Sequence, residues 1–157
     1  RYGESLELSQ QDTLVLLVNE RYKLPENLYI DQDVFRLSSS NMIAPSIKIY
    51  STDDTIPTLR VQFYTQEEKP VYDNMDFNWD YKNDTLRFDN YIKIARQWRA
   101  QKVTLSLYLP ENKKVLLTPQ TSQYLRNLRD FDWKVRSKLN KDQILLIMRD
   151  GKLQPLM

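Results

Sequence analysis

The chain has 157 residues, of which 41% are hydrophobic, 28% are charged and 11% are aromatic. This composition is typical of a folded globular domain and excludes a disordered or fibrous chain. The chain contains no His and no Cys, so zinc sites, Ser-His-Asp triads, thiol nucleophiles and haem or iron–sulfur centres lack their usual residues. Its two glycines, Gly3 and Gly151, are too few for a glycine-rich phosphate loop. We therefore predict no catalytic residues, no metal and no cofactor.

Charge is distributed unevenly along the chain. Residues 1–90 carry nine Lys and Arg against sixteen Asp and Glu, whereas residues 91–157 carry fourteen against five. The basic half predicts either an anionic partner, such as nucleic acid or a lipid headgroup surface, or attraction between the two halves of one fold. Because the basic residues are scattered and form no like-charge block, we favour attraction within the fold and expect no nucleic-acid partner.

The length predicts one β domain over residues 1–157, with an N-terminal subdomain over residues 1–45 as the alternative division. No apolar run approaches the ~20 residues that span a bilayer, and no signal-peptide pattern opens the chain. The first residue is Arg1 and not Met. We therefore expect a targeting or membrane segment to lie outside this sequence.

Apolar residues recur with period two or in short runs, which favours strands over helices. Residues 14–18 form a short apolar run, typical of a strand buried on both faces. Residues 47–49 and 59–63 alternate apolar and polar side chains on either side of the turn-forming residues 51–54. This pattern predicts a hairpin of two half-buried strands.

The clearest strand pattern spans residues 75–88, where aromatic and polar side chains alternate around a turn formed by Asn83 and Asp84. Asn and Asp tolerate the positive φ that a tight turn requires. Closing the hairpin there matches apolar side chains with each other and an acid with a base. The predicted pairs are Tyr81 with Leu86, Asp80 with Arg87, and Trp79 with Phe88. We expect the aromatic face to lie in the core through Phe77, Trp79 and Phe88.

The C-terminal half predicts further strands and one helix. Residues 103–109 alternate and residues 115–117 form an apolar run, which together predict another hairpin. A short helix is expected near residues 119–129, because Pro119 suits its first turn and apolar side chains share one face. Residues 144–148 predict a buried strand that ends in a turn at positions 149 to 152.

The predicted fold class is therefore all-β. We expect antiparallel hairpins in a β-sandwich or a β-solenoid-like stack, with the one short helix at its edge or end. Exposed edge strands in such a fold make self-association an additional expectation.

Acidic residues beside aromatic ones offer a carbohydrate-active or carbohydrate-binding alternative. The aromatic side chains lie on the strand face opposite the carboxylates, however, so one sugar does not easily meet both. A calcium site is disfavoured because the Asp-x-Asp-x-Asp-Gly loop is absent. The residues considered are Asp53, Asp54, Asp73, Asp76, Asp80, Trp79 and Tyr81.

Residues 91–102 interleave basic and aromatic side chains. One hypothesis is a patch for an anionic polymer, such as an acidic sugar, a headgroup surface or nucleic acid. The alternative, which we favour, is a connection whose tryptophan packs inward and whose cations face the acidic half. The residues of this candidate patch are Lys93, Arg96, Trp98, Arg99 and Lys102.

Four segments carry a family resemblance, namely residues 78–81, 85–91, 97–111 and 148–153. Together they resemble the C-terminal extracytoplasmic region of Bacteroidetes-type phage shock protein C (PspC) domain proteins, which is similar to adhesin-like β domains. The chain departs from the family pattern at Asn112, where glycine is usual, and at Lys152, which precedes the closing leucine. Asn also adopts the left-handed conformation, so we expect the turn at position 112 to be preserved.

The resemblance implies a membrane-anchored protein whose transmembrane PspC part lies outside this sequence. It also implies that the β domain projects into the periplasm or cell envelope from the inner membrane, and it brings no catalytic residues with it. Our leading hypothesis is a non-enzymatic interaction or sensing domain of a stress-response protein, with an unknown protein or envelope polymer as partner. The alternatives are the carbohydrate module and anionic lipid or nucleic-acid binding by the basic half.

Three Asp-Thr-apolar triplets resemble the periplasmic O-glycosylation site of the same bacteria. The alternative is a turn that enters a strand, with Asp suited to the turn and Thr to the strand. The threonines concerned are Thr13, Thr55 and Thr85.

Overall fold

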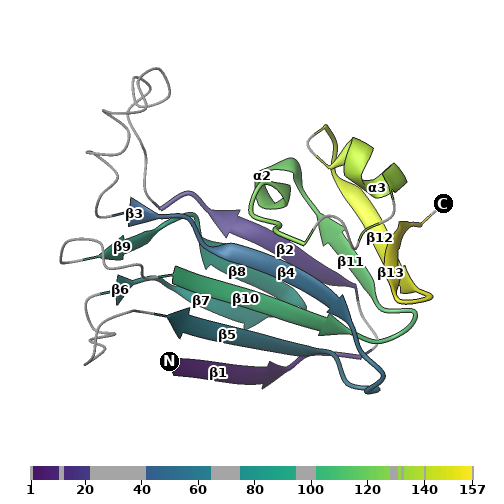
Figure 1. Ribbon diagram of the computed structural model, residues 1–157, viewed down its shortest axis with the longest axis horizontal. Helices are drawn as coiled ribbons and strands as arrows, with labels where there is room; N and C mark the ends of the chain where they lie inside the picture. Colours follow the sequence, from purple (N-terminus) through teal and green to yellow (C-terminus); the bar gives the residue numbers. More distant parts are fainter. Residues whose placement is uncertain are drawn as a thin grey trace.

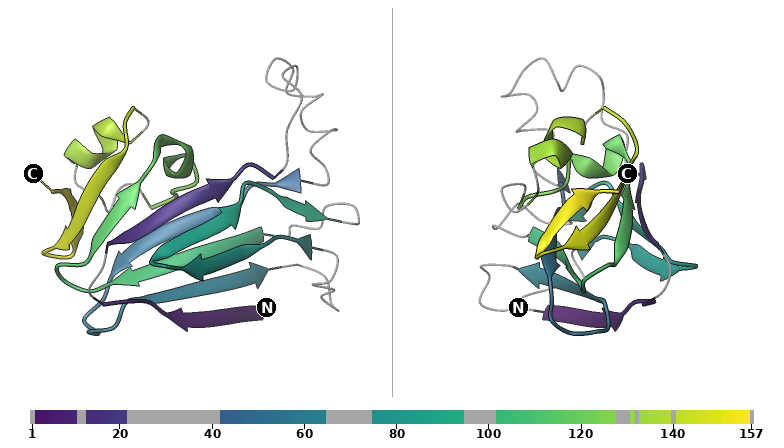
Figure 2. Two further views of the ribbon diagram at one scale, coloured as in Figure 1. Left: turned by 180° about the vertical axis from the view of Figure 1, so that it is seen from behind. Right: turned by 90° about the vertical axis from the view of Figure 1, so that its right-hand side faces the viewer.

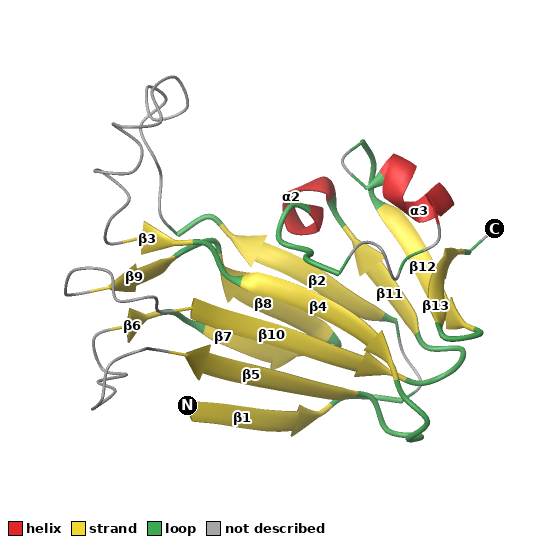
Figure 3. Ribbon diagram, viewed as in Figure 1, coloured by secondary structure: helices red, strands yellow, loops and turns green. Residues whose placement is uncertain are grey.

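The fold is built from β-strands in two large sheets and one small sheet (Figure 1). A computed structural model describes residues 2–10, 13–21, 42–64, 75–94, 102–127, 131, 133–139 and 141–156. Helix is confined, within these ranges, to two short segments (Figure 3). Neither of them is long and apolar enough to cross a membrane. The prediction of an all-β fold is confirmed.

Sheet A has four strands. Their order across the sheet is β1 (Tyr2–Glu7), β5 (Thr58–Tyr64), β10 (Lys102–Leu109) and β4 (Ser46–Ser51). β10 is antiparallel to β5 and parallel to β4, and β1 is antiparallel to β5. β10 is therefore an inner strand that holds hydrogen-bonded neighbours on both sides.

Sheet B has six strands and sheet C has three. The order in sheet B is β13 (Lys152–Pro155), β12 (Ile144–Arg149), β11 (Lys114–Leu117), β2 (Leu14–Asn19), β8 (Thr85–Asp89) and β7 (Trp79–Lys82). The order in sheet C is β3 (Met42–Ile43), β9 (Ile92–Ile94) and β6 (Met75–Asp76). Figure 1 shows sheet A in front of β7 and β8, and Figure 2 shows the same layers from behind.

The core lies between sheets A and B. Val103, Leu105 and the next alternate residues of β10 are fully buried, and residues of both sheets form one hydrophobic cluster. Phe88 of β8 meets Tyr124 edge to face, with ring centroids 5.6 Å apart. β4 and β5 thus bury alternate residues, as their alternating sequences require, whereas β12 buries residues 146–148 in succession.

One predicted hairpin and one predicted turn are confirmed. β7 and β8 pair as expected, joining Trp79 to Phe88, Asp80 to Arg87 and Tyr81 to Leu86. At their turn, Asn83 and Asp84 have φ values of 53° and 59°, the left-handed conformation that these residues tolerate. The predicted turn at residues 149–152 is also present, and it joins β12 to β13 in a hairpin that was not predicted. Asn112 also lies in the left-handed region, with a φ of 73°, as expected where the family usually has glycine.

Two other predicted hairpins are wrong. β4 and β5 belong to one sheet, but β10 lies between them and pairs with both. β10 and β11 follow each other in the chain, yet β10 joins sheet A and β11 joins sheet B. Alternation specifies which face of a strand is buried, whereas it leaves the identity of the neighbouring strand open. As a result, three parallel pairs replace the purely antiparallel arrangement that we expected.

The predicted helix near residues 119–129 is shorter than expected. Helix α2 spans Pro119–Ser122 and begins at Thr118, whose Oγ1 accepts a hydrogen bond from the backbone N–H of Thr121. After this single turn the backbone enters a bridge between Leu125 and β4 of sheet A. A second helix, α3 (Trp133–Lys138), was not predicted and packs beside β13.

The segment after α2 covers the β4 edge of sheet A. The side-chain amide of Asn127 accepts a hydrogen bond from the Ile49 N–H at 3.1 Å and donates one to the Ile49 carbonyl at 2.6 Å. Asn127 is 8% exposed, so both bonds are shielded from water. The amide replaces the backbone of a further strand, because its donor and acceptor match the two groups that an edge residue leaves unpaired.

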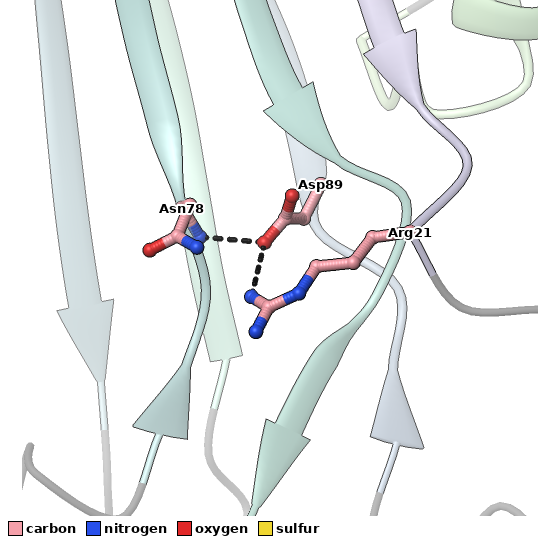
Figure 4. A network of polar contacts seen from close by, with 3 residues as sticks. All are labelled: Arg21, Asn78 and Asp89. Atoms are coloured by element: carbon pink, nitrogen blue, oxygen red, sulfur yellow. Dashed lines mark hydrogen bonds and ion pairs between the residues drawn. The ribbon is translucent and has the colours of Figure 1, made fainter.

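A buried carboxylate joins three segments near the end of β8 (Figure 4). Asp89 is 2% exposed. Its Oδ2 accepts hydrogen bonds from the Asn78 N–H at 2.7 Å and from Arg21 Nη1 at 3.0 Å. This contact coincides with the interruption of the strand predicted from position 75, since Phe77 and Asn78 separate β6 from β7.

We expect Asp89→Ala to lower the free energy of unfolding by about 1–3 kcal/mol, because the Asn78 N–H loses its acceptor and the ion pair with Arg21 is lost. Urea denaturation followed by circular dichroism measures this change. Asp80→Ala is the matched control, since Asp80 is an exposed aspartate in the neighbouring strand. Equal losses in the two variants would contradict a structural role for the buried carboxylate.

Candidate binding face on sheet A

The outer face of sheet A, which points away from sheet B, is shaped by the sequence of β10. Val103 and Leu105 of this strand point into the core, so Thr104 and Ser106 point outward. Both are short side chains. The centre of the outer face is therefore lower than its surroundings.

Longer side chains lie on both sides of Thr104 and Ser106 along the direction of β10. The strand register places Lys102 beside Tyr64 at one end and Tyr108 beside Tyr50 at the other. The two tyrosines of the second pair are stacked, with ring centroids 5.5 Å apart and an interplanar angle of 23°. Lys102 to Tyr108 is six residues along β10, so the two ends are separated by about 20 Å.

These side chains enclose a trough with a volume of about 380 Å³. We call it the sheet A trough. Its lining residues come from three neighbouring strands and are Lys48, Tyr50, Gln62, Tyr64, Lys102, Thr104, Ser106 and Tyr108. None of these described lining residues is acidic. The trough therefore offers cations, hydroxyl groups, an amide and aromatic rings to a ligand.

Positive charge is concentrated around the trough. Lys48 faces Ser106 from β4, and Arg60 faces it from β5. At the far end, Lys102 Nζ lies 5.0 Å from the centroid of the Tyr64 ring. No carboxylate of the described residues forms an ion pair with these three cations. Their charge is thus available to an anionic group.

Ser106 forms the floor of the trough. It is only 4% exposed, and among the described residues its hydroxyl makes no hydrogen bond. Buried polar groups in folded proteins almost always have a partner. A ligand atom or a water molecule in the trough is the natural partner for this hydroxyl.

A larger hollow, of about 540 Å³, lies between loops at another edge of the fold, and two of its charged residues already form hydrogen bonds within the protein. Lys113 donates to the Ser9 carbonyl. The carboxylate of Glu111 accepts from the Asp150 N–H. We therefore select the smaller trough as the candidate site.

The structure describes only part of the basic patch predicted from the sequence. Lys93 is exposed on β9 in sheet C, and Lys102 belongs to the sheet A trough. Arg96, Trp98 and Arg99 lie outside the described residues. The two described cations therefore lie on different sheets.

The aromatic strand contributes to the core. Phe77 is 8% exposed and Phe88 is fully buried, while Trp79 is half-buried and packs against the core cluster. The acidic Asp80 is exposed on the opposite face. This arrangement does not bring aromatic rings and carboxylates together as a sugar-cleaving site requires.

No group of three acidic residues in the described ranges could hold a metal ion. This concerns Asp53, Asp54 and Asp80, whereas Asp73 and the side chain of Asp76 lie outside the described part of the chain.

The three threonines of the Asp-Thr-apolar triplets lie at different kinds of position. Thr55 is exposed in the loop between β4 and β5. Thr85 begins β8, where its hydroxyl donates to the Asn83 carbonyl. Thr13 is half-buried just before β2. Glycosylation at these threonines stays a prediction.

Sequence reasoning missed the trough, although it had identified most of the outward positions. Lys48, Arg60 and Gln62 were recognised as the polar members of alternating strands. Their meeting depends on β10 lying between β4 and β5, which the alternation does not reveal. A stronger signal was the pair of short side chains, Thr104 and Ser106, between Lys102 and Tyr108.

We expect the trough cations to contribute little to the fold. Lys48→Gln should change the free energy of unfolding by no more than about 0.5 kcal/mol, because Lys48 forms no ion pair with a described residue. Urea denaturation of the variant and of the unmodified protein measures the difference. A loss several times larger would show that Lys48 has a structural role.

A family model described as a toast-rack domain found in some PspC proteins matches residues 29–155. This range includes the three strands that line the trough. Comparisons with curated proteins and with solved structures found no match.

Proposed function

The chain belongs to the family of toast-rack domains found in some PspC proteins, as its residues had indicated, and from this premise we propose a function. The domain is a non-enzymatic interaction domain of a membrane-anchored PspC protein. It projects from the inner membrane into the periplasm or cell envelope. There it binds a partner through the sheet A trough, and occupation of the trough is the signal that the domain senses.

The observation that carries this proposal is the trough itself. It lies on a sheet whose opposite face is the core, so the backbone that carries its side chains is positioned without a ligand. Tyr50 and Tyr108 stack at one end, and Lys102 lies over Tyr64 at the other. Such a preformed surface suits recognition, because binding does not first have to order the chain.

The chemistry of the trough supports binding in preference to catalysis. The chain has no His or Cys, and the described lining residues include no Asp or Glu. The side chains that most often transfer protons in enzymes are therefore missing from the trough. Its lysines, hydroxyl groups and amide are suited to holding an anionic or hydroxyl-rich partner.

Filling the trough tests this proposal. Thr104→Tyr places a ring on the floor while keeping a residue that favours strands. We expect wild-type protein to co-sediment with washed cell-envelope particles from the source organism, and the variant to bind about tenfold less, a loss that corresponds to roughly 1.4 kcal/mol.

Gln154→Tyr is the matched control, since Gln154 is a half-buried polar residue on β13 of sheet B. Its binding should equal that of the wild type. Circular dichroism establishes that both variants are folded. Undiminished binding by folded Thr104→Tyr would contradict the trough as the contact surface.

A further inference from the structure

Resting on the proposed function, we infer that the ligand of the sheet A trough is an acidic polysaccharide. One chain of sugar units lies across the strands, with its carboxylates on the trough cations and its rings against the tyrosines. The inference is drawn from the shape, the charge and the hydrogen-bonding groups of the trough.

The shape favours a chain over a flat surface. The floor, Thr104 and Ser106, lies below longer side chains at both ends of the trough, including the stacked pair Tyr50 and Tyr108. A lipid bilayer is flat on this scale, so it would meet the raised tyrosines and not the floor. An extended polymer, by contrast, fits between the two ends, which are about 20 Å apart along β10.

The charge favours an acidic ligand. Lys48, Arg60 and Lys102 stand on the outer face from three different strands. Glu7, which the register places beside Thr58, is a carboxylate of the same face, and it belongs to β1, outside the trough lining. A ligand that lies across the strands and carries a negative charge on successive units would meet Lys48 and Arg60, which lie on either side of Ser106.

The aromatic and polar groups favour sugar rings. The flat apolar face of a pyranose packs on tyrosine, and the phenol hydroxyl groups remain available for hydrogen bonds. On the floor, the buried Ser106 hydroxyl has no hydrogen-bond partner among the described residues. Gln62 and Thr104 add a donor and acceptors beside it. Sugar hydroxyl groups both donate and accept, so they complement all three of these side chains.

The test is isothermal titration of the whole chain with polygalacturonate oligosaccharides at low salt. Three comparison polymers separate the contributions: dextran has sugar rings without charge, polyglutamate has carboxylates without rings, and a thymidine oligonucleotide has charge with planar bases. We expect binding of polygalacturonate that weakens as salt is raised. Each comparison polymer should bind at least about tenfold more weakly.

Two substitutions examine the groups separately. Tyr108→Leu removes a ring while keeping an apolar side chain, and Lys48→Gln removes a cation. Each should weaken polygalacturonate binding by about fivefold to tenfold. Lys114→Gln, an exposed lysine on sheet B, is the matched control and should bind as the wild type does. Thr104→Tyr, which fills the trough, should abolish polygalacturonate binding.

The outcomes distinguish this inference from the proposed function. Equal binding of polyglutamate, dextran or the oligonucleotide would overturn the acidic polysaccharide as ligand. The inference would also be overturned if the protein did not bind polygalacturonate but still bound envelope particles, with Thr104→Tyr weakening the particle binding. In that case the proposed function would stand. If Thr104→Tyr weakened neither polygalacturonate binding nor envelope-particle binding, both the inference and the proposed function would be overturned.

Discussion

The position of β10 between β5 and β4 is the constraint on which the rest of the structure depends. One set of alternate residues on this strand, beginning with Val103, is fully buried and supplies the centre of the core. The other set, Thr104 and Ser106, forms the floor of the trough. Because both sets belong to the same strand, the packing that stabilises the domain also fixes the geometry of its binding face.

At the edges of the sandwich, polar side chains form hydrogen bonds that a neighbouring strand would otherwise form. Asn127 bonds both backbone groups of Ile49 and completes the β4 edge. Asp89 holds Asn78 where the chain leaves sheet C for sheet B. The first contact follows the short helix α2, and the second coincides with the interruption of the predicted strand. Neither contact could be read from local propensity, since each partner is distant in the sequence.

The faces of the strands could be predicted from the sequence, whereas their neighbours could not. The β7–β8 hairpin was correct to the residue, because Asn83 and Asp84 define its turn and every facing pair is complementary. The pairing of β4 with β5 was wrong, because alternation is satisfied equally well when β10 lies between them. The trough is assembled from these three strands. It could therefore be identified only once the strand order was known, even though most of its residues had already been assigned to the polar faces of strands.

The central claim is that ligands bind on the outer face of sheet A. Nuclear magnetic resonance tests it directly, by following the backbone amide signals of the isotopically labelled domain during titration with a galacturonate oligosaccharide. The account predicts that the largest shifts occur along β10 from Lys102 to Tyr108 and at the facing residues of β4 and β5. Shifts confined to the loop hollow around Glu111, or to α3 and the β12–β13 hairpin, would contradict it.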